Sequence, residues 1–374
     1  MIYLDYAANY PTKKLVLDEL YSVELNYIGN ANSTHSLGQK SKQLLNECND
    51  NIYKYLKLDK DKYDIIHTSS ATEANNLAIK GIVKSYSAFG NKILVSELEH
   101  NSINATLGYL KEQGYEVEFV KTMPNGKIDL EDLKNKLTNK TILACLTLLD
   151  SELATLEDYL EITKIISEYK NCHLLMDVTQ AISKYDFDLN KIEMLTFTPH
   201  KFGGLIGTGI LLKRKSTILT PLIHGGESAS VYRSGSIPLG LIASSAKAIE
   251  LMSINKQQNV LKMQEIANYF LNKIKDIKEI KINSFNNLFI FNLSIVNRKG
   301  VEVVNYLSQN EIYISQKSAC SIKNTPSKIV MAVYNDKKRA LECFRISISE
   351  LTTKEEIDEL VEKLRSFIWK DTKK

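Results

Sequence analysis

Short apolar runs alternate with longer amphipathic stretches along the first two thirds of the chain. Such runs predict strands, and they occur at residues 63–67, 92–95, 116–120, 142–148, 173–176 and 194–197. Segments that favour helices lie between them, at residues 72–85, 102–113, 130–137 and 156–169. Strands that are separated by helices are typical of a parallel or mixed sheet with both faces covered. This part of the chain is therefore predicted to form an α/β domain.

The pattern changes after residue 238. A long stretch without proline predicts one long helix at 239–277. The elements predicted after it are strands at 280–282, 288–295 and 344–348 and helices at 301–309 and 353–368. This order predicts a second, smaller α+β domain. We expect the large domain to span residues 15–250 and the small domain to combine residues 1–14 with residues 251–374.

Composition is that of an ordinary globular protein, since 44% of the 374 residues are hydrophobic and 25% are charged. Lysine and arginine exceed aspartate and glutamate by 48 − 44 = 4, too small an excess to favour nucleic acid as a partner. The most apolar run, 142–149, is far shorter than the roughly 20 residues of a membrane helix. The N-terminus also lacks the layout of a signal peptide. We therefore expect neither a nucleic acid nor a membrane as partner.

The five cysteines are scattered and form no C-x-x-C pair. This spacing argues against a zinc site or a disulfide framework, so no metal is expected and a reduced, cytoplasmic protein is predicted. Cys145 and Cys172 lie in apolar runs, where cysteine is typical of packing. Cys320 instead lies in a polar segment close to Lys317 and Lys323, which favours a reactive thiolate.

Small polar residues follow the first predicted strand of the large domain. Ser70, Ala71 and Thr72 come after strand 63–67, at the start of a helix. Free backbone N–H groups at a helix N-terminus attract anions, most often phosphate. The alternative is an ordinary N-cap formed by Ser70 or Thr72.

Two further strands end at residues that can ionise. His100 follows strand 92–95 and is either an acid–base group or an ordinary surface or core histidine. Asp177 ends the apolar run 173–176, with Gln180 three residues later. A buried carboxylate needs a cationic partner, so Asp177 suits a ligand with a protonated nitrogen. The alternative is that Asp177 caps the following segment.

The most informative stretch surrounds Lys201. This lysine follows strand 194–197 and precedes four glycines within residues 203–209. Glycine lets the backbone approach a bulky ligand, and Thr198 and His200 offer donors beside the lysine. A partly desolvated lysine loses proton affinity and becomes a usable amine nucleophile.

Taken together and in order, these residues form a recognisable pattern. The chain resembles the cysteine desulfurases, which are pyridoxal-phosphate enzymes of the class V aminotransferase group with the type I fold. The resemblance runs nearly from end to end without large gaps. The motifs that carry it are YLDYAAN at 3–9, STHSLG at 33–38, SATEANN at 70–76, EH at 99–100, DVTQ at 177–180, TPHK at 198–201, RSGS at 233–236, SAC at 318–320 and FRIS at 344–347.

The resemblance implies a large cofactor-binding domain with a mostly parallel, mixed seven-stranded sheet, a smaller α+β domain, and pyridoxal 5'-phosphate as the cofactor. Lys201 would hold the cofactor as a Schiff base and later move the α-proton of the substrate. Asp177 would pair with the pyridinium nitrogen, so that the ring acts as an electron sink. Gln180 would bind the phenolic oxygen. His100 would stack on the ring and act as an acid–base group.

The resemblance also implies a phosphate cradle and a homodimer. Ala71 and Thr72 would hold the phosphate together with Thr198 and His200. Ser236 would join them from the partner subunit across the dimer interface.

For the substrate side, the resemblance implies L-cysteine, with its carboxylate clamped by Arg345 and with Asn32 as a further substrate contact. Cys320 would attack the substrate sulfur, which leaves alanine and a persulfide on the protein. The persulfide sulfur would then pass to an acceptor protein. The acceptor pathway stays open between iron–sulfur cluster assembly, tRNA thiolation and thiamine synthesis.

The chain departs from the family pattern at three places. The usual Asn-Asn-Glu is Asp150, Ser151 and Glu152 here, so the residue that would contact the cofactor's phenolic oxygen is the shorter Ser151. Ser70 and Ser236 replace a glycine and a threonine. The segment from Cys320 to 326–327 is short.

Two alternatives therefore remain beside a cysteine desulfurase. One is a selenocysteine lyase or another enzyme of the same fold, which Cys320 helps to distinguish because transamination needs no thiol. The other is a catalytically weak, cofactor-binding partner in sulfur relay, which is suggested by Asp150 and Ser151.

Overall fold

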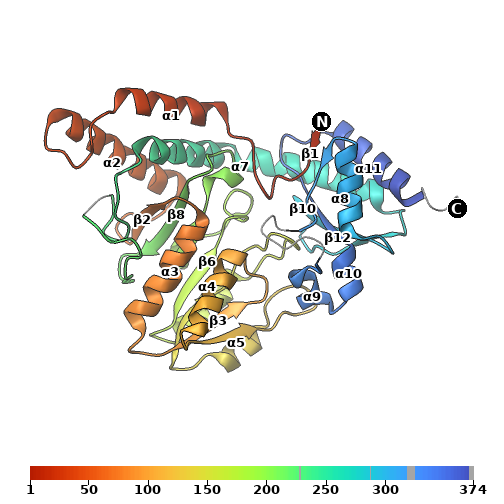
Figure 1. Cartoon of the computed structure of the whole chain (residues 1–374), viewed down its shortest axis with the longest axis horizontal. Helices are drawn as coiled ribbons and strands as arrows, with labels where there is room; N and C mark the ends of the chain where they lie inside the picture. The colour runs from red at the N-terminus through yellow and green to blue at the C-terminus, as the bar shows by residue number, and fades with distance from the viewer. Residues whose placement is uncertain (227–228, 287, 318–324, 370–374) are drawn as a thin grey trace.

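The computed structural model describes residues 1–226, 229–286, 288–317 and 325–369. Within them, the main sheet has seven strands in the order β2-β8-β7-β6-β5-β3-β4 (Figure 1). The strands are β2 Tyr63–Thr68, β3 Lys92–Ser96, β4 Glu116–Val120, β5 Thr141–Cys145, β6 His173–Asp177, β7 Met194–Phe197 and β8 Gly209–Arg214. β8 is antiparallel to β2 and β7, and the other neighbouring strands are parallel. The predicted mostly parallel, mixed sheet is confirmed.

Alternate side chains of the main sheet enter two different hydrophobic cores, because successive residues of a strand point to opposite faces. The helices of this part of the chain are α1 Lys14–Asn26, α2 Ser36–Leu56, α3 Ala71–Tyr86, α4 Asn101–Glu112, α5 Leu130–Lys136 and α6 Tyr159–Ser167. On β3, Ile93 and Val95 belong to the core that includes α3 and α4. Leu94 belongs to the core that includes α2 and α6. Helices therefore cover both faces of the sheet.

A smaller antiparallel sheet with the strand order β12-β10-β9 lies at the other end of the molecule. The elements of this part are α7 Leu239–Ile274, β9 Ile280–Ile282, β10 Ile290–Ile295, α8 Gly300–Gln309, β11 Ile312–Tyr313, α9 Lys328–Tyr334, α10 Lys337–Glu342, β12 Cys343–Ser347 and α11 Lys354–Trp369. The N-terminal strand β1 (Ile2–Tyr3) pairs with β11, so the start of the chain joins this end (right side of Figure 1). α7 connects both ends of the molecule. The predicted domain boundary at residue 250 falls inside α7 and stays a prediction.

Most predicted elements are present, with a few differences. α6 begins at Tyr159 rather than at residue 156, because Asp158 caps it by accepting a hydrogen bond from Glu161 N. β5 ends at Cys145, yet the backbone keeps following β6 through bonds from Leu146 N and Leu148 N. The described residues also form elements that were not predicted, namely α1, α2, α9, α10, β1, β8 and β11.

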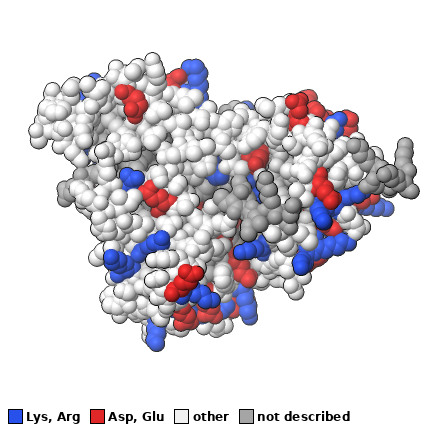
Figure 2. Space-filling model, viewed as in Figure 1, with Lys and Arg blue, Asp and Glu red and all other residues white. Residues whose placement is uncertain are grey.

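The exposed face in Figure 2 carries acidic and basic side chains that are interspersed rather than gathered by sign. The area over α1 and α2 is largely uncharged there. Within the described ranges, no helix has both the length and the apolar character that a membrane span needs.

Candidate active site

Ten of the predicted site residues line one cavity of about 280 Å³ at the carboxyl ends of the parallel strands. They are Ala71, Thr72, His100, Ser151, Asp177, Gln180, Thr198, His200, Lys201 and Arg345. The loops that follow β3, β5, β6 and β7 converge at this edge of the sheet, and α/β proteins place their ligands there for that reason. Residues far apart in the sequence thus share a single site.

Asp177 is the last residue of β6, and its carboxylate is fixed by neutral donors. Oδ1 accepts a hydrogen bond from Thr179 N over 2.9 Å, and Oδ2 accepts one from Asn75 Nδ2 over 3.1 Å. The bond from Thr179 N closes a turn after β6, so Asp177 also caps the following segment, as the alternative in the sequence analysis proposed. Both of these donors are uncharged, so the Asp177 carboxylate can face a cationic nitrogen in the cavity.

Asn75 is a site residue to which the sequence analysis assigned no role. It is fully buried on α3, and its Oδ1 accepts a hydrogen bond from the Thr196 hydroxyl over 2.5 Å. Its Nδ2 also donates to Ser102 Oγ over 2.9 Å. An asparagine among the buried alanine and leucine side chains of an amphipathic helix was the available signal, since buried amides need partners.

His100 is oriented by this same network. Its Nδ1 accepts the Ser102 backbone N–H over 3.1 Å and lies 2.9 Å from Ser102 Oγ. Since Asn75 Nδ2 donates to the Ser102 hydroxyl oxygen, that hydroxyl can donate its own hydrogen bond to His100 Nδ1. The neutral ring then carries its proton on Nε2. Burial lowers the pKa of His100, and the charge of Lys201 adds to this against the opposing effect of Asp177, so the neutral form is favoured.

Lys201 lies at the end of a short 3-10 helix after β7 (Pro199–Lys201). Its Nζ donates to the carbonyl oxygens of Ala7 and Ala8 over 3.0 and 2.6 Å. Gln180 Nε2 donates to the same Ala7 oxygen over 3.0 Å. Gln180 Oε1 is buried and has no hydrogen-bond partner within the described residues. The N-terminal segment therefore holds both side chains at the cavity wall.

The cavity end near α3 is built for close approach to the backbone. Ser70 is the N-cap of α3, since its hydroxyl accepts Glu73 N over 3.1 Å, so the capping alternative is correct for this residue. Ala71 and Thr72 begin the helix and line the cavity. At Gly209, an added Cβ would lie only 2.2 Å from the Ser70 carbonyl carbon, which explains glycine at the start of β8.

Thr198 and His200 are bound to each other at this end. Thr198 Oγ1 donates to Thr208 O over 2.7 Å and lies 2.7 Å from His200 Nδ1. Because the hydroxyl proton is used by Thr208, His200 Nδ1 is the donor in that pair. Burial, with a contribution from Lys201, lowers the pKa of His200 to about 4. Thr198 thus fixes the orientation of His200.

Arg345 reaches the cavity from β12 of the small sheet. Its Nη2 pairs with Asp5 Oδ1 over 2.9 Å, and its Nη1 donates to Ser151 O over 2.9 Å. Asp5 is in turn fixed by the Ser315 hydroxyl over 2.7 Å. The buried Nε has no partner within the described residues. The Nε–H group and the remaining N–H group on each Nη atom are therefore available as donors to a carboxylate.

The loop with Asp150 and Ser151 is held by hydrogen bonds from its backbone N–H groups to the Asp150 side chain. Asp150 Oδ1 accepts N–H bonds from Glu152 and Leu153 over 2.8 and 2.7 Å, and Oδ2 accepts one from Thr155 over 2.7 Å. The carboxylate thus shapes the loop. Ser151 lines the cavity and also lends its carbonyl to Arg345.

Glu99, beside His100, is a buried acid close to Asp177. It accepts a hydrogen bond from Thr147 N. Burial raises the pKa of Glu99 well above its usual value, and the charge of Asp177 adds to that rise. Burial thus favours the uncharged form of Glu99, which reduces the negative charge beside Asp177.

Three predicted residues are not part of this cavity. Ser236 is exposed and lines a separate cavity of about 220 Å³, with Thr68, Gly209 and Arg233 among its neighbours. Asn32 is exposed and its N–H bonds to Asn30 Oδ1 over 2.9 Å. Cys320 lies outside the described residues.

Comparison with known proteins gives a consistent picture. The family model "Aminotransferase class-V" matches residues 2–360. A cysteine desulfurase IscS of Dictyoglomus turgidum is 30% identical over 395 aligned residues, with 100% of this chain and 99% of the relative covered. A solved NifS-like protein has a TM-score of 0.91 at 25% identity, with 98% and 99% covered. The structure of SspA in complex with cysteine has a TM-score of 0.81 at 26% identity, with 94% and 100% covered.

Proposed function

The chain belongs to the class V aminotransferase family, and from that premise we propose that it is a pyridoxal-phosphate-dependent cysteine desulfurase. The observation that carries the proposal is the convergence of Asp177, His100, Lys201 and Arg345 on one cavity of about 280 Å³. The four residues supply an anion for a ring nitrogen, a neutral histidine, an amine and a carboxylate clamp. Relatives that match over the whole length bear the name cysteine desulfurase.

The cavity fits pyridoxal 5'-phosphate at three points. Asp177 offers a carboxylate that is held by two neutral donors, Thr179 N and Asn75 Nδ2. Gln180 Oε1 is a buried polar atom without a partner within the described residues. The start of α3, where Ala71 and Thr72 line the cavity, offers backbone N–H groups to a phosphate. When bound, the cofactor supplies an electron sink for cleavage of bonds at the substrate Cα and Cβ.

The chain's own residues hold the cofactor and move protons. Asp177 would pair with the protonated ring nitrogen, and Gln180 would bind beside the ring. Ala71 and Thr72 would hold the phosphate group at the start of α3, and Thr198 and His200 line the cavity beside them. Lys201 would hold the cofactor through Nζ, the atom that donates to the carbonyl oxygens of Ala7 and Ala8 in this structure, and would take the substrate α-proton at the same atom. His100, neutral through burial, would present Nε2–H to the cavity and donate a proton there.

L-cysteine is the proposed substrate, with its carboxylate on the free donors of Arg345. The Cys320 thiolate attacks the substrate sulfur, so that an S–S bond forms while the substrate Cβ–S bond breaks. The carbon fragment gains protons and leaves as L-alanine. Atoms balance as L-cysteine plus a thiol giving L-alanine plus a persulfide. A sulfur-acceptor protein then takes the outer sulfur of the persulfide.

A homodimer is part of this proposal. Ser236 lies outside its own subunit's active-site cavity, so a contact with phosphate requires a second subunit. Several large apolar side chains are exposed on α1 and the loop after it, namely Leu15, Leu17, Tyr21, Leu25 and Ile28. Exposed apolar patches of this kind mark contacts between proteins. A cytoplasmic location is also proposed, because the four described cysteines are free thiols.

Three variants test the proposal and its alternatives. Lys201→Ala is expected to abolish the visible absorbance of covalently bound cofactor, which the wild-type protein shows. Persulfide formation that survives Cys320→Ala would instead assign the chemistry to another mechanism of the same fold. If Ser151→Asn raises a very low wild-type turnover, the sulfur-relay alternative gains support. Because backbone N–H groups hold the Asp150 carboxylate within its loop, we expect the wild-type enzyme to be active without an asparagine at position 151.

A further inference from the structure

A salt bridge outside the active-site cavity connects a loop to the start of α3. Arg233 Nε donates to Glu73 Oε1 over 3.0 Å, and both side chains are largely buried. Glu73 lies in the first turn of α3. Arg233 belongs to residues 230–236, which we call the Ser236 loop. The proposed reaction gives neither residue a role, yet both lie next to groups that the cofactor phosphate would contact.

Glu73 holds the backbone that leads into the phosphate cradle. Its Oε2 accepts hydrogen bonds from Ser69 N over 2.8 Å and from Ser69 Oγ over 2.5 Å. Its own N–H donates to Ser70 Oγ over 3.1 Å. The next two residues after Ser70 begin α3 and line the active-site cavity. One oxygen of the Glu73 carboxylate thus supports the cradle of its own subunit, while the other binds Arg233.

Lys213 on β8 anchors the Ser236 loop at a second point. The Lys213 side chain is fully buried and pairs with Asp64 Oδ2 over 2.7 Å. Its Nζ also lies 4.3 Å from the centre of the Tyr232 ring, a distance at which a cation is attracted to an aromatic face. Within the loop, Ser230 and Arg233 form an antiparallel bridge. Two neighbouring side chains therefore fix this loop to the sheet and to α3.

The anchored loop carries Ser236 at an exposed position. Gly235 before it has a φ of +127°, a conformation that residues with a side chain rarely adopt. An added Cβ at Gly235 would lie 3.0 Å from Arg233 Nη1, so the turn before Ser236 fits closely against the arginine. Within the described part of the chain, the cavity that Ser236 lines shares no residue with the active-site cavity. Ser236 is thus held in a fixed loop, outside the active site of its own subunit.

We propose that Arg233 and Glu73 are positioning residues that hold Ser236 in place for the phosphate site of the partner subunit. The proposal rests on the proposed function, in which Ser236 reaches the cofactor phosphate across a dimer interface. Glu73 then links the two phosphate sites of the dimer, because its carboxylate holds the cradle of one subunit and the loop that serves the other. A loop that is ordered in advance loses less conformational freedom when the cofactor binds, which strengthens binding.

Mixed dimers test the proposal, because they separate the effect of a residue on its own subunit from its effect on the partner. One subunit carries Lys201→Ala, so the absorbance of covalently bound cofactor comes from the other subunit alone. Cofactor-free mixed dimers are titrated with pyridoxal 5'-phosphate, and the dissociation constant is measured from that absorbance. Arg233→Gln is placed either on the Lys201→Ala subunit or on the subunit with the intact lysine.

On the Lys201→Ala subunit, Arg233→Gln is expected to raise the dissociation constant about tenfold, the effect of one lost hydrogen bond to a charged group. On the subunit with intact Lys201, the same change is expected to leave the dissociation constant unaltered. Arg233→Lys keeps a charged donor for Glu73 and is expected to restore tight binding. Arg365→Gln on α11 is the matched control, because Arg365 Nη2 bonds to Lys273 O over 3.2 Å, away from both cavities.

Two further variants sharpen the test. Ser236→Ala on the Lys201→Ala subunit should weaken binding as much as Arg233→Gln does, and the two changes together should weaken it no further, because Arg233 acts through Ser236. Glu73→Gln should weaken binding from either subunit, since Glu73 supports both phosphate sites. This nearly isosteric change keeps the proposal testable if Arg233→Gln unfolds more readily than the wild type in a thermal unfolding control.

Each remaining outcome counts against the inference. Equal effects of Arg233→Gln from the two subunits, or additive effects of Arg233→Gln and Ser236→Ala, would overturn it and leave the proposed chemistry intact. A monomeric protein that attaches the cofactor tightly would overturn it as well. If the wild-type dimer attaches no cofactor, the proposed function fails together with the inference.

Discussion

Asn75 on α3 donates a hydrogen bond from Nδ2 to the Asp177 carboxylate on β6 over 3.1 Å. The same amide group donates to Ser102, which in turn contacts His100. A single buried asparagine thus links the proposed anion for the cofactor ring to the neutral histidine. Since both bonds come from one planar amide, Asp177 and His100 are oriented together.

The Asn75→Ala variant is expected to bind pyridoxal 5'-phosphate about tenfold more weakly than the wild type, because a hydrogen bond to a charged group contributes roughly 1.5 kcal/mol. The dissociation constant is measured from the absorbance of the bound cofactor. Asn76→Ala is the matched control, since Asn76 bonds only to Thr72 O on its own helix in the contacts described here. Equal affinity of the two variants would contradict the role given to Asn75.

Arg345→Lys is expected to raise the KM for L-cysteine by roughly 10- to 100-fold while the bound-cofactor spectrum stays unchanged. Lysine keeps the charge but cannot reach Asp5, Ser151 and a carboxylate with one planar group. Steady-state kinetics with L-cysteine provide the measurement. Arg339→Lys is the control, because Arg339 bonds to Asn283 and Ile282 away from the cavity. A changed kcat with an unchanged KM would count against a carboxylate clamp.

The pH profile of kcat/KM follows from the environment of His100. Burial and Lys201 lower the pKa of His100 below its ordinary 6.5, so the neutral ring persists into mildly acidic solution. The acid limb of the profile is therefore expected below pH 6.5, where protonation removes the neutral ring. His100→Gln should lose this limb and react about 100-fold more slowly. An acid limb of the wild type above that value would be inconsistent with a buried, neutral His100.

Stability has its own dependence on pH through Glu157, which accepts a hydrogen bond from Ile128 N over 3.0 Å. Burial raises the pKa of Glu157 from 4.5 to about 7. The folded state therefore holds a proton that the unfolded state releases, so the free energy of unfolding falls as pH rises through this window. Above it, Glu157→Gln is expected to be more stable than the wild type by about 3 kcal/mol.

Chemical denaturation at acidic and alkaline pH measures this difference. Below pH 4.5 the two proteins should differ little, because the wild-type carboxyl is protonated in both states. Glu161→Gln, at an exposed position on α6, should show no such dependence. A gain in stability for Glu157→Gln that is the same at both pH values would refute the explanation.

Much of the fold could be predicted because its strands are short, apolar and separated by amphipathic helices. The positions of β2 to β7 along the chain were predicted from that pattern, whereas their order in the sheet, β2-β8-β7-β6-β5-β3-β4, was not. α1 was harder to predict since Leu15, Leu17 and Leu25 are exposed, so its apolar positions do not form one buried stripe. β8 begins at a glycine that the sequence analysis assigned to a ligand loop.

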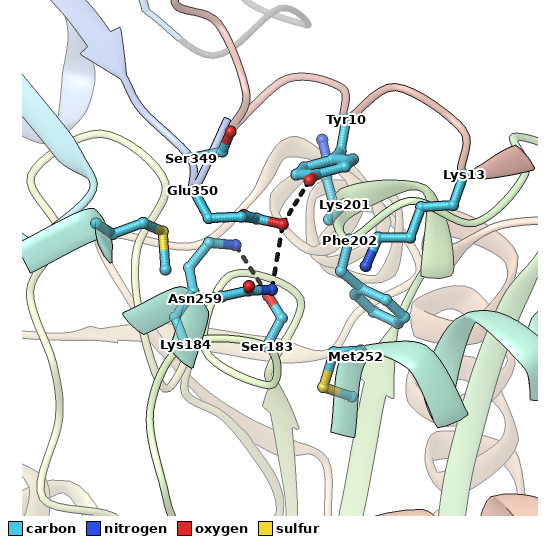
Figure 3. A pocket seen from close by; sticks show the side chains of 11 residues that line it. Tyr10, Lys13, Ser183, Lys184, Lys201, Phe202, Met252, Asn259, Ser349 and Glu350 are labelled. Carbon is cyan, nitrogen blue, oxygen red and sulfur yellow. Dashed lines mark hydrogen bonds between the residues drawn. The ribbon is translucent and has the colours of Figure 1, made fainter. Parts of the chain in front are cut away.

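The site was predictable where a residue stands at the end of a strand, as with Asp177 and His100. What could not be predicted was how these residues are held. Asp5 pairs with Arg345 across 340 positions of sequence, and the N-terminal segment is brought there by the pairing of β1 with β11 and by the bridge between Asp5 and Ser347. In a small cavity that Lys201 also lines, Tyr10 and Glu350 likewise meet from opposite ends of the chain (Figure 3).

The most direct test of the proposed function follows the sulfur atom. Cofactor-loaded protein is mixed with L-cysteine without reductant, and the alanine formed is quantified. The mass of each cysteine-containing peptide is then measured by mass spectrometry. We predict one alanine per persulfide formed, with the added sulfur on Cys320, in the wild type and in the control variant Cys48→Ala, and neither product in Cys320→Ala. Cofactor binding without any alanine, or alanine formed equally well in Cys320→Ala, would contradict the assignment as a cysteine desulfurase.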